Sequence, residues 1–379
     1  MPATSFTIDI PQHRIEWILR RLAEAHWPDV PAVPAWGLGT DPACLRELVT
    51  HWLGEYDWRK EEAALNRWPH FLADVEGQTL HFLHVRGSGA NPRPVLLIHG
   101  WPGTFTEFLG VIERLAHPER FGGRAEDGMS LVIPSLPGFG FSGKPRTPIG
   151  PRAIAGLFDR LMTEVLGYDG YLAQGGDWGS SISYWLGREG RGCGAVHTNF
   201  IAGWGMTNMD PASELFQASR AKFFDIARSE GGYQSIQGTK PLTLSYALQD
   251  SPLGTAAWIL EKFRSWSHLL DGQLWSVYDR DALITHLMVY LVTDTIGTST
   301  WIYTLMGQDG SPLPGRFDKP LGVANFPGEL FVLPRTYYES QFPILRWTDM
   351  EKGGHFAAME QPALFAAELQ AFMARIRSL

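Results

Sequence analysis

Gly175-Gly176-Asp177-Trp178-Gly179 separates two segments of different character. The apolar run Tyr171–Ala173 before it is typical of a buried strand, and residues 182–186 after it carry apolar side chains at helical spacing. The five residues therefore predict a sharp turn from strand to helix, with a nucleophile between glycines that let the two elements pack closely. Asp177 would be that nucleophile, at the N-terminus of the helix. The competing interpretation is a glycine-rich turn with an acidic cap.

The segments around this turn alternate between strand and helix. Short apolar runs bounded by glycine and proline predict buried strands, and i, i+3, i+4 spacing of apolar residues predicts helices. The alternation favours an α/β fold with a mostly parallel sheet flanked by helices. The predicted strands are Val95–Ile98, Leu131–Ile133, Tyr171–Ala173, Leu321–Phe326 and Ile344–Trp347, and the predicted helices are 105–115, 151–167 and one that begins at Pro362.

The remaining segments suggest how the chain is divided. Residues 1–94 contain helical patterns, one of them capped by Asp41 before Pro42, followed by a hairpin around Glu76-Gly77. We expect them to form an N-terminal arm and first strands packed on the core. Residues 95–200 would be the first part of the core, 201–308 a helical lid rich in aromatic residues, and 309–379 the second part of the core.

Composition excludes several classes of function. The net charge of −8 gives no electrostatic reason to bind nucleic acid or an anionic membrane. No stretch of 18 apolar residues predicts a membrane span, and the N-terminus lacks the pattern of a signal peptide. With only two cysteines, a disulfide framework is not expected. These features predict a cytoplasmic protein.

The motif His99-Gly100-Trp101-Pro102-Gly103 closes the predicted strand Val95–Ile98. In the fold that uses such a nucleophile turn, this position supplies half of an oxyanion hole. The backbone N–H groups of Trp101 and Trp178 would then point at one oxygen. A tight turn rich in proline and glycine is the alternative, but two such turns, each after a buried strand, favour the catalytic interpretation.

A general base and its partner are expected near the C-terminus. His355, in Gly353-Gly354-His355-Phe356, follows the last predicted strand, which fits the order nucleophile, acid, histidine. Glu329 lies just past the strand Leu321–Phe326 and could orient the imidazole ring. The competing carboxylates are Asp294, Asp318 and Glu339.

The motifs HGWPG, GGDWG and GGHFAAME together resemble the microsomal-type epoxide hydrolases, as do Tyr56-Asp57-Trp58-Arg59 and residues 82–86. The resemblance covers nearly the whole chain and implies an α/β-hydrolase fold. It also implies an aspartate nucleophile, a histidine base oriented by a glutamate, and two lid tyrosines that bind the epoxide oxygen. Through residues 232–241 and 295–303 these tyrosines are Tyr233 and Tyr303.

The resemblance implies conversion of an epoxide to a vicinal diol, with no metal or organic cofactor. Trp101, Trp178, Tyr233 and Tyr303 would contact the substrate. The animal enzymes begin with a membrane anchor that this chain lacks, so we expect a bacterial relative acting on a natural-product intermediate, such as one from an enediyne pathway, or on a xenobiotic epoxide. A homodimer is possible.

Two other functions stay open at this point. A haloalkane dehalogenase also uses an aspartate followed by tryptophan, but needs no acid for its leaving group; the paired tyrosines favour the epoxide. A non-catalytic binding protein of the same fold has no need for Asp177, His355 and both tyrosines. A serine esterase is disfavoured because no G-x-S-x-G motif follows a strand.

Overall fold

The computed structural model describes residues 2–204, 209–309 and 317–378. The strands of these residues form one sheet in the order β1-β2-β3-β5-β4-β6-β7-β8-β9. The strands are β1 Thr4–Phe6, β2 His70–Val75, β3 Gln78–Val85, β4 Arg93–Ile98, β5 Met129–Pro134, β6 Tyr171–Gly175, β7 Cys193–Thr198, β8 Leu321–Asn325 and β9 Ile344–Asp349.

The sheet is mostly parallel, as predicted. Strands β5, β4, β6, β7, β8 and β9 run parallel to one another, and β1, β2 and β3 are added antiparallel at one edge. The predicted hairpin joins β2 to β3, and both Glu76 and Gly77 have positive φ angles, 55° and 80°. Strand β7 was not predicted, because Gly194, His197 and Thr198 interrupt its apolar pattern.

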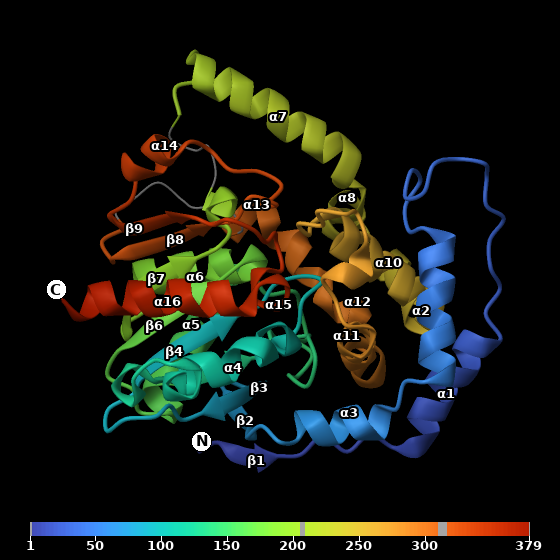
Figure 1. The fold of residues 1–379 in the computed structure, drawn as a ribbon, viewed down its shortest axis with the longest axis horizontal. Coiled ribbons are helices and arrows are strands. Elements are labelled where there is room, and N and C mark those ends of the chain that lie inside the picture. The colour runs from blue at the N-terminus through green and yellow to red at the C-terminus, as the bar shows by residue number, and fades with distance from the viewer. Residues whose placement is uncertain (1, 205–208, 310–316, 379) are drawn as a thin grey trace.

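Helices cover both faces of the sheet. Helices α4 (Leu109–Ala116) and α16 (Pro362–Arg377) pack together on one face, and α5 (Pro151–Arg160) and α6 (Asp177–Glu189) on the other (Figure 1). The predicted helix 105–115 begins as a 3-10 turn, η1 (Phe105–Phe108), which leads into α4. The predicted helix 151–167 is α5 followed by a π-helical turn at Leu161–Val165.

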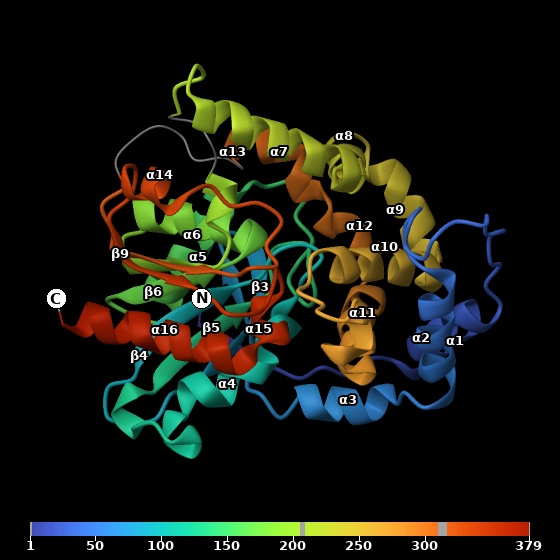
Figure 2. The same ribbon diagram turned by 45° about the horizontal axis from the view of Figure 1, so that its top comes forward.

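The helices between β7 and β8 form a separate layer at the edge of the sheet where the parallel strands end (Figure 2). The expected lid range, 201–308, includes residues 205–208, and the expected last part of the core includes 310–316; both segments lie outside the described residues. The elements of this layer are α7 Glu214–Glu230, α8 Gly232–Thr239, α9 Pro241–Asp250, α10 Pro252–Ser265, α11 Arg280–Thr293, α12 Ile296–Ser299, η7 Trp301–Leu305 and α13 Met306–Asp309.

The N-terminal helices lie against the lid. We expected the whole arm to pack on the core, but only β1, β2 and β3 join the core sheet. Helices α1 (Gln12–Ala23), α2 (Pro42–Gly54) and α3 (Trp58–Leu65) instead contact α10 and α11 (Figure 1). Arg14 donates to the Leu291 carbonyl oxygen at 2.6 Å, and the Tyr56 and Thr285 hydroxyls lie 3.0 Å apart. The arm thus encloses the lid from outside. Across the described ranges, no helix is long and apolar enough to cross a membrane.

Candidate active site

Asp177 is the first residue of α6 and follows β6 with one glycine between them. Its φ angle of +48° lies in the left-handed region, which costs a non-glycine residue about 1–3 kcal/mol. Close packing enforces this turn: a Cβ atom on Gly179 would lie 2.1 Å from the carbonyl oxygen of Ile98, in the neighbouring strand β4. The helix therefore starts directly against the sheet, and Asp177 projects beyond the strand ends.

The turn 99–103 meets this carboxylate. The backbone N–H of Trp101 donates a hydrogen bond of 2.7 Å to Asp177 Oδ1. Within the described part of the chain, the backbone N–H of Trp178 makes no hydrogen bond to the Asp177 side chain. One of the two expected donors is therefore engaged, while the other directly follows Asp177 in the chain.

His355 lies between two carboxylates. Its Nε2 atom is 3.4 Å from Asp177 Oδ2, and its Nδ1 atom is 3.0 Å from both carboxylate oxygens of Glu329. The side chains of His355 and Glu329 are 4% and 2% exposed, so water hardly screens this pair. Burial acts to lower the pKa of His355, but the Glu329 and Asp177 carboxylates outweigh it and raise the pKa well above its usual value.

The competing carboxylates are placed elsewhere. Asp294 pairs with Arg14 of the N-terminal arm, and Glu339 pairs with Arg335 at 2.7 Å. Asp318 precedes β8, whereas Glu329 follows it. The order of strand and carboxylate matters because the carboxyl ends of parallel strands meet at one edge of the sheet, where Asp177 also lies.

Both predicted tyrosines reach the site from the lid. Tyr233, on α8, stacks on the Trp101 ring with centroids 5.2 Å apart and an interplanar angle of 9°. Tyr303, on η7, packs edge-on against the rings of Trp178 and Tyr233, at 4.9 and 5.7 Å. Burial, followed by the charge of Asp177, raises the pKa of Tyr233, and burial also raises that of Tyr303. Both phenols are therefore protonated at neutral pH.

A small cavity lies beside the Asp177 carboxylate. Its volume open to water is about 10 Å³, close to the space of one water molecule. Asp177, His355 and a further carboxyl, that of Glu107, are its charged or titratable wall groups. The other lining residues are Gly100, Trp101, Gly103, Phe108, Gly176, Asn199, Phe356, Ala357, Ala358 and Phe365.

Comparisons with known proteins identify the family to which the chain belongs. Residues 3–108 match the family model described as the N terminus of epoxide hydrolases, and residues 93–199 match that of the alpha/beta hydrolase fold. A protein of Stigmatella aurantiaca named as a candidate epoxide hydrolase is 40% identical over 99% of this chain and 86% of its own length. Epoxide hydrolase 1 of Sus scrofa is 35% identical over 87% of this chain and 79% of its own length. This chain belongs to the epoxide hydrolase family.

The fold agrees with a solved member of that family. The juvenile hormone epoxide hydrolase of the silkworm Bombyx mori superposes with a TM-score of 0.85 and 28% identity, over all of this chain and 94% of the silkworm chain. The present chain is therefore an α/β-hydrolase-fold enzyme that hydrolyses epoxides. This finding favours the epoxide over the dehalogenase and the non-catalytic alternatives.

Several residues that position the epoxide hydrolase site were not predicted. On lid helix α11, His286 Nε2 lies 2.7 Å from the Pro102 carbonyl oxygen, and the Tyr290 hydroxyl donates to the Gly103 carbonyl oxygen at 2.6 Å. These two bonds tie the lid to the turn that presents Trp101. The sequence signal is weak, because both side chains lie within a helix that is apolar on all sides.

Glu360 was also not predicted, although it ends the motif GGHFAAME. Its carboxylate accepts hydrogen bonds from the backbone N–H groups of Phe356 and His268, at 3.0 and 2.8 Å. Burial raises the pKa of Glu360 to about 7. The side chain fastens the loop that carries His355, so its place in the motif has a structural reason.

Proposed function

We propose that this epoxide hydrolase opens its substrate through a covalent ester on Asp177. The Asp177 carboxylate attacks one carbon of the epoxide ring from the side opposite the ring oxygen. The bond between that carbon and the ring oxygen then breaks. The hydrogen bond from Trp101 positions the nucleophile, because it engages Oδ1 and leaves Oδ2 facing His355. The strained turn supports the role, since backbone strain concentrates where a side chain must be aimed.

Tyr233 and Tyr303 stabilise the departing oxygen in this proposal. An alkoxide is a poor leaving group, so ring opening requires a hydrogen-bond or proton donor. The two raised pKa values keep both phenols protonated, and the Tyr303 hydroxyl has no hydrogen-bond partner among the described residues. An unpartnered donor in a buried aromatic site is expected to bind a ligand oxygen.

His355 then activates the water that cleaves the ester. Neutral His355 accepts a proton from the water through Nε2, and Glu329 fixes the ring through Nδ1. The water oxygen adds to the carboxyl carbon of Asp177, and the backbone N–H groups of Trp101 and Trp178 bind the resulting oxyanion. Such donors are aimed at the tetrahedral intermediate, so Trp178 needs no bond to the resting carboxylate.

The observation that carries the proposal is that His355 contacts Asp177 through Nε2, at 3.4 Å, and Glu329 through Nδ1, at 3.0 Å. The test is a single turnover of styrene oxide in ¹⁸O-labelled water, followed by mass spectrometry. The label should enter Asp177, because the first diol takes its new oxygen from the carboxylate. Label in the first diol would rule out the covalent ester.

The natural substrate stays a prediction. The sequence led us to expect a natural-product or xenobiotic epoxide, and the aromatic rings around Asp177 favour substrates with apolar substituents. A chiral product assay on terminal, aryl and alkyl epoxides would rank these classes. Preference for small polar epoxides over aryl epoxides would contradict the expected apolar pocket.

A further inference from the structure

Glu107 is a half-buried carboxyl group in an unusual place. It lies in η1, four residues after the turn 99–103, and folds back over that turn: a Cβ atom on Gly103 would lie 1.5 Å from Glu107 Oε1. A Cβ atom on Gly100, in the same turn, would lie 2.1 Å from Asp177 Oδ1. The two carboxyl groups thus occupy the space beside two glycines of one turn.

The cavity between these groups differs from the place where the epoxide is opened. Asp177, His355 and Glu107 line it, but neither Tyr233 nor Tyr303 does. Its volume of about 10 Å³ is enough for one water molecule and too small for an epoxide with substituents. In the proposed mechanism the epoxide lies on the side of Tyr233 and Tyr303, which pack on the rings of Trp101 and Trp178, whereas this cavity lies beside Asp177, His355 and Glu107.

A buried water needs two to four polar partners. On this wall, His355 Nε2 has no hydrogen-bond partner among the described residues, although it lies 3.4 Å from Asp177 Oδ2. Over the same described residues, nothing donates a hydrogen bond to the Glu107 carboxyl group. Two polar groups with free hydrogen-bonding capacity thus line a space of the right size, beside the carbon that the water must attack.

We propose that Glu107 binds the hydrolytic water in this cavity, as its second partner beside His355. The inference rests on the proposed ester at Asp177. Glu107 orients the water oxygen toward the carboxyl carbon of Asp177 and exchanges no proton in the net reaction. The water proton passes to His355 Nε2, the oxygen adds to the carbon, and on collapse the ester carbon–oxygen bond breaks and the leaving alkoxide takes the proton from His355.

The protonation state of Glu107 is compatible with this role. Burial, together with the nearby charge of Asp177, raises the pKa of Glu107 to about 8, while His355 acts in the opposite direction. A neutral carboxyl group at pH 7 can both donate to and accept from a water. It also avoids placing a second negative charge beside the nucleophile while the epoxide is attacked.

The test separates formation of the ester from its hydrolysis in Glu107→Gln and Glu107→Leu. With styrene oxide, rapid quenching and intact-mass measurement follow the ester through the mass added to the chain. Glutamine keeps a hydrogen-bonding group and leucine does not, so ester hydrolysis should slow about tenfold in the first variant and about a hundredfold in the second. Ester formation should change less than about threefold in both, because the tyrosine side of Asp177 is untouched.

Glu113→Gln is the matched control, because Glu113 lies on α4 and pairs with Arg120 at the surface. It should leave both steps unchanged. Equal ester lifetimes in the wild-type enzyme and Glu107→Leu would overturn the proposal, as would an equal loss in both steps, which indicates a structural role. If the wild-type enzyme itself forms no ester, the proposed function fails, and that outcome is distinct because it appears without any substitution.

Discussion

The proposed catalytic groups come from two regions that are held in different ways. Asp177, His355 and Glu329 follow strand ends of the sheet, and hydrogen bonds and ion pairs fix each of them. Tyr233 and Tyr303 come from the lid, where ring contacts position them. The sheet therefore orients the charged side chains, whereas the lid supplies apolar surroundings and two neutral hydrogen-bond donors.

The two regions also differ in their electrostatics. On the sheet, carboxylates on both sides raise the pKa of His355 despite its burial. On the lid, burial raises the pKa of Tyr233, and Asp177 adds to the effect. In the proposed mechanism, the negative charge of Asp177 therefore helps to keep both tyrosines protonated, and conversion of Asp177 to a neutral ester would remove one of the two charges that raise the pKa of His355. The proposed order of the two chemical steps follows from this change of charge.

The largest effect is expected for His355→Gln, a substitution on the sheet side of the site. Turnover should fall about a thousandfold, because general-base catalysis is lost. Ester formation should continue, so intact-mass measurement should show the chain accumulating in the alkylated form. Loss of ester formation together with turnover would show that the two regions do not divide the reaction in this way.

The complementary change is the double variant Tyr233→Phe with Tyr303→Phe, on the lid side. Ester formation should slow about a hundredfold, because both donors to the departing oxygen are removed while the rings remain. No ester should accumulate, and rapid-quench kinetics would measure this. A double variant with full activity would remove the tyrosines from the mechanism.

A smaller effect is expected for Glu329→Gln. Loss of this charged partner should slow ester hydrolysis about tenfold to a hundredfold. Since the Glu329 carboxylate raises the pKa of His355, its removal lowers that pKa, and neutral His355 persists to more acidic pH. The acid limb of the pH–rate profile for hydrolysis should therefore move to lower pH. A shift to higher pH would contradict the proposed pairing.

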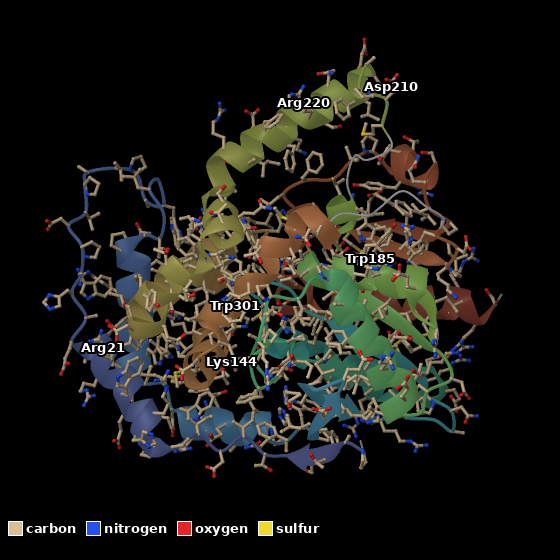
Figure 3. All side chains as sticks on the ribbon, turned by 180° about the vertical axis from the view of Figure 1, so that it is seen from behind. Arg21, Lys144, Trp185, Asp210, Arg220 and Trp301 are labelled. Atoms are coloured by element: carbon tan, nitrogen blue, oxygen red, sulfur yellow. The ribbon has the colours of Figure 1, made fainter. Side chains whose placement is uncertain are left out.

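The smallest effect is expected on α7, which lies outside the rest of the lid (Figure 3). Arg220, which is labelled in Figure 3, lies on this helix. Among the described residues of α7, only Ser219 is buried. Phe224 is 55% exposed, so Phe224→Ser should change the free energy of unfolding by less than about 0.5 kcal/mol. Turnover should stay within about twofold. A larger loss of turnover, measured in a chiral product assay, would show that this helix takes part in substrate binding.

Local sequence patterns were enough to predict most of the sheet. Continuous apolar runs identify β4, β5 and β6 because these strands are buried on both faces. Polar and glycine positions concealed β7, whose side chains His197 and Thr198 are buried in the structure. The position of α1, α2 and α3 against the lid could not be predicted, because an amphipathic helix shows that it has a buried face but not which surface covers it.

The sequence by itself determined the sharp turn at Asp177, the proposed nucleophile, the order of Asp177, Glu329 and His355, and the resemblance that indicated Tyr233 and Tyr303. Each of these is read from a local motif or from the order of such motifs along the chain. Only the tertiary structure placed Glu107 beside Asp177 and His355, and only it tied His286 and Tyr290 to the turn 99–103. These contacts join segments far apart in the chain, or depend on how a side chain folds back over a turn, and no local pattern specifies either.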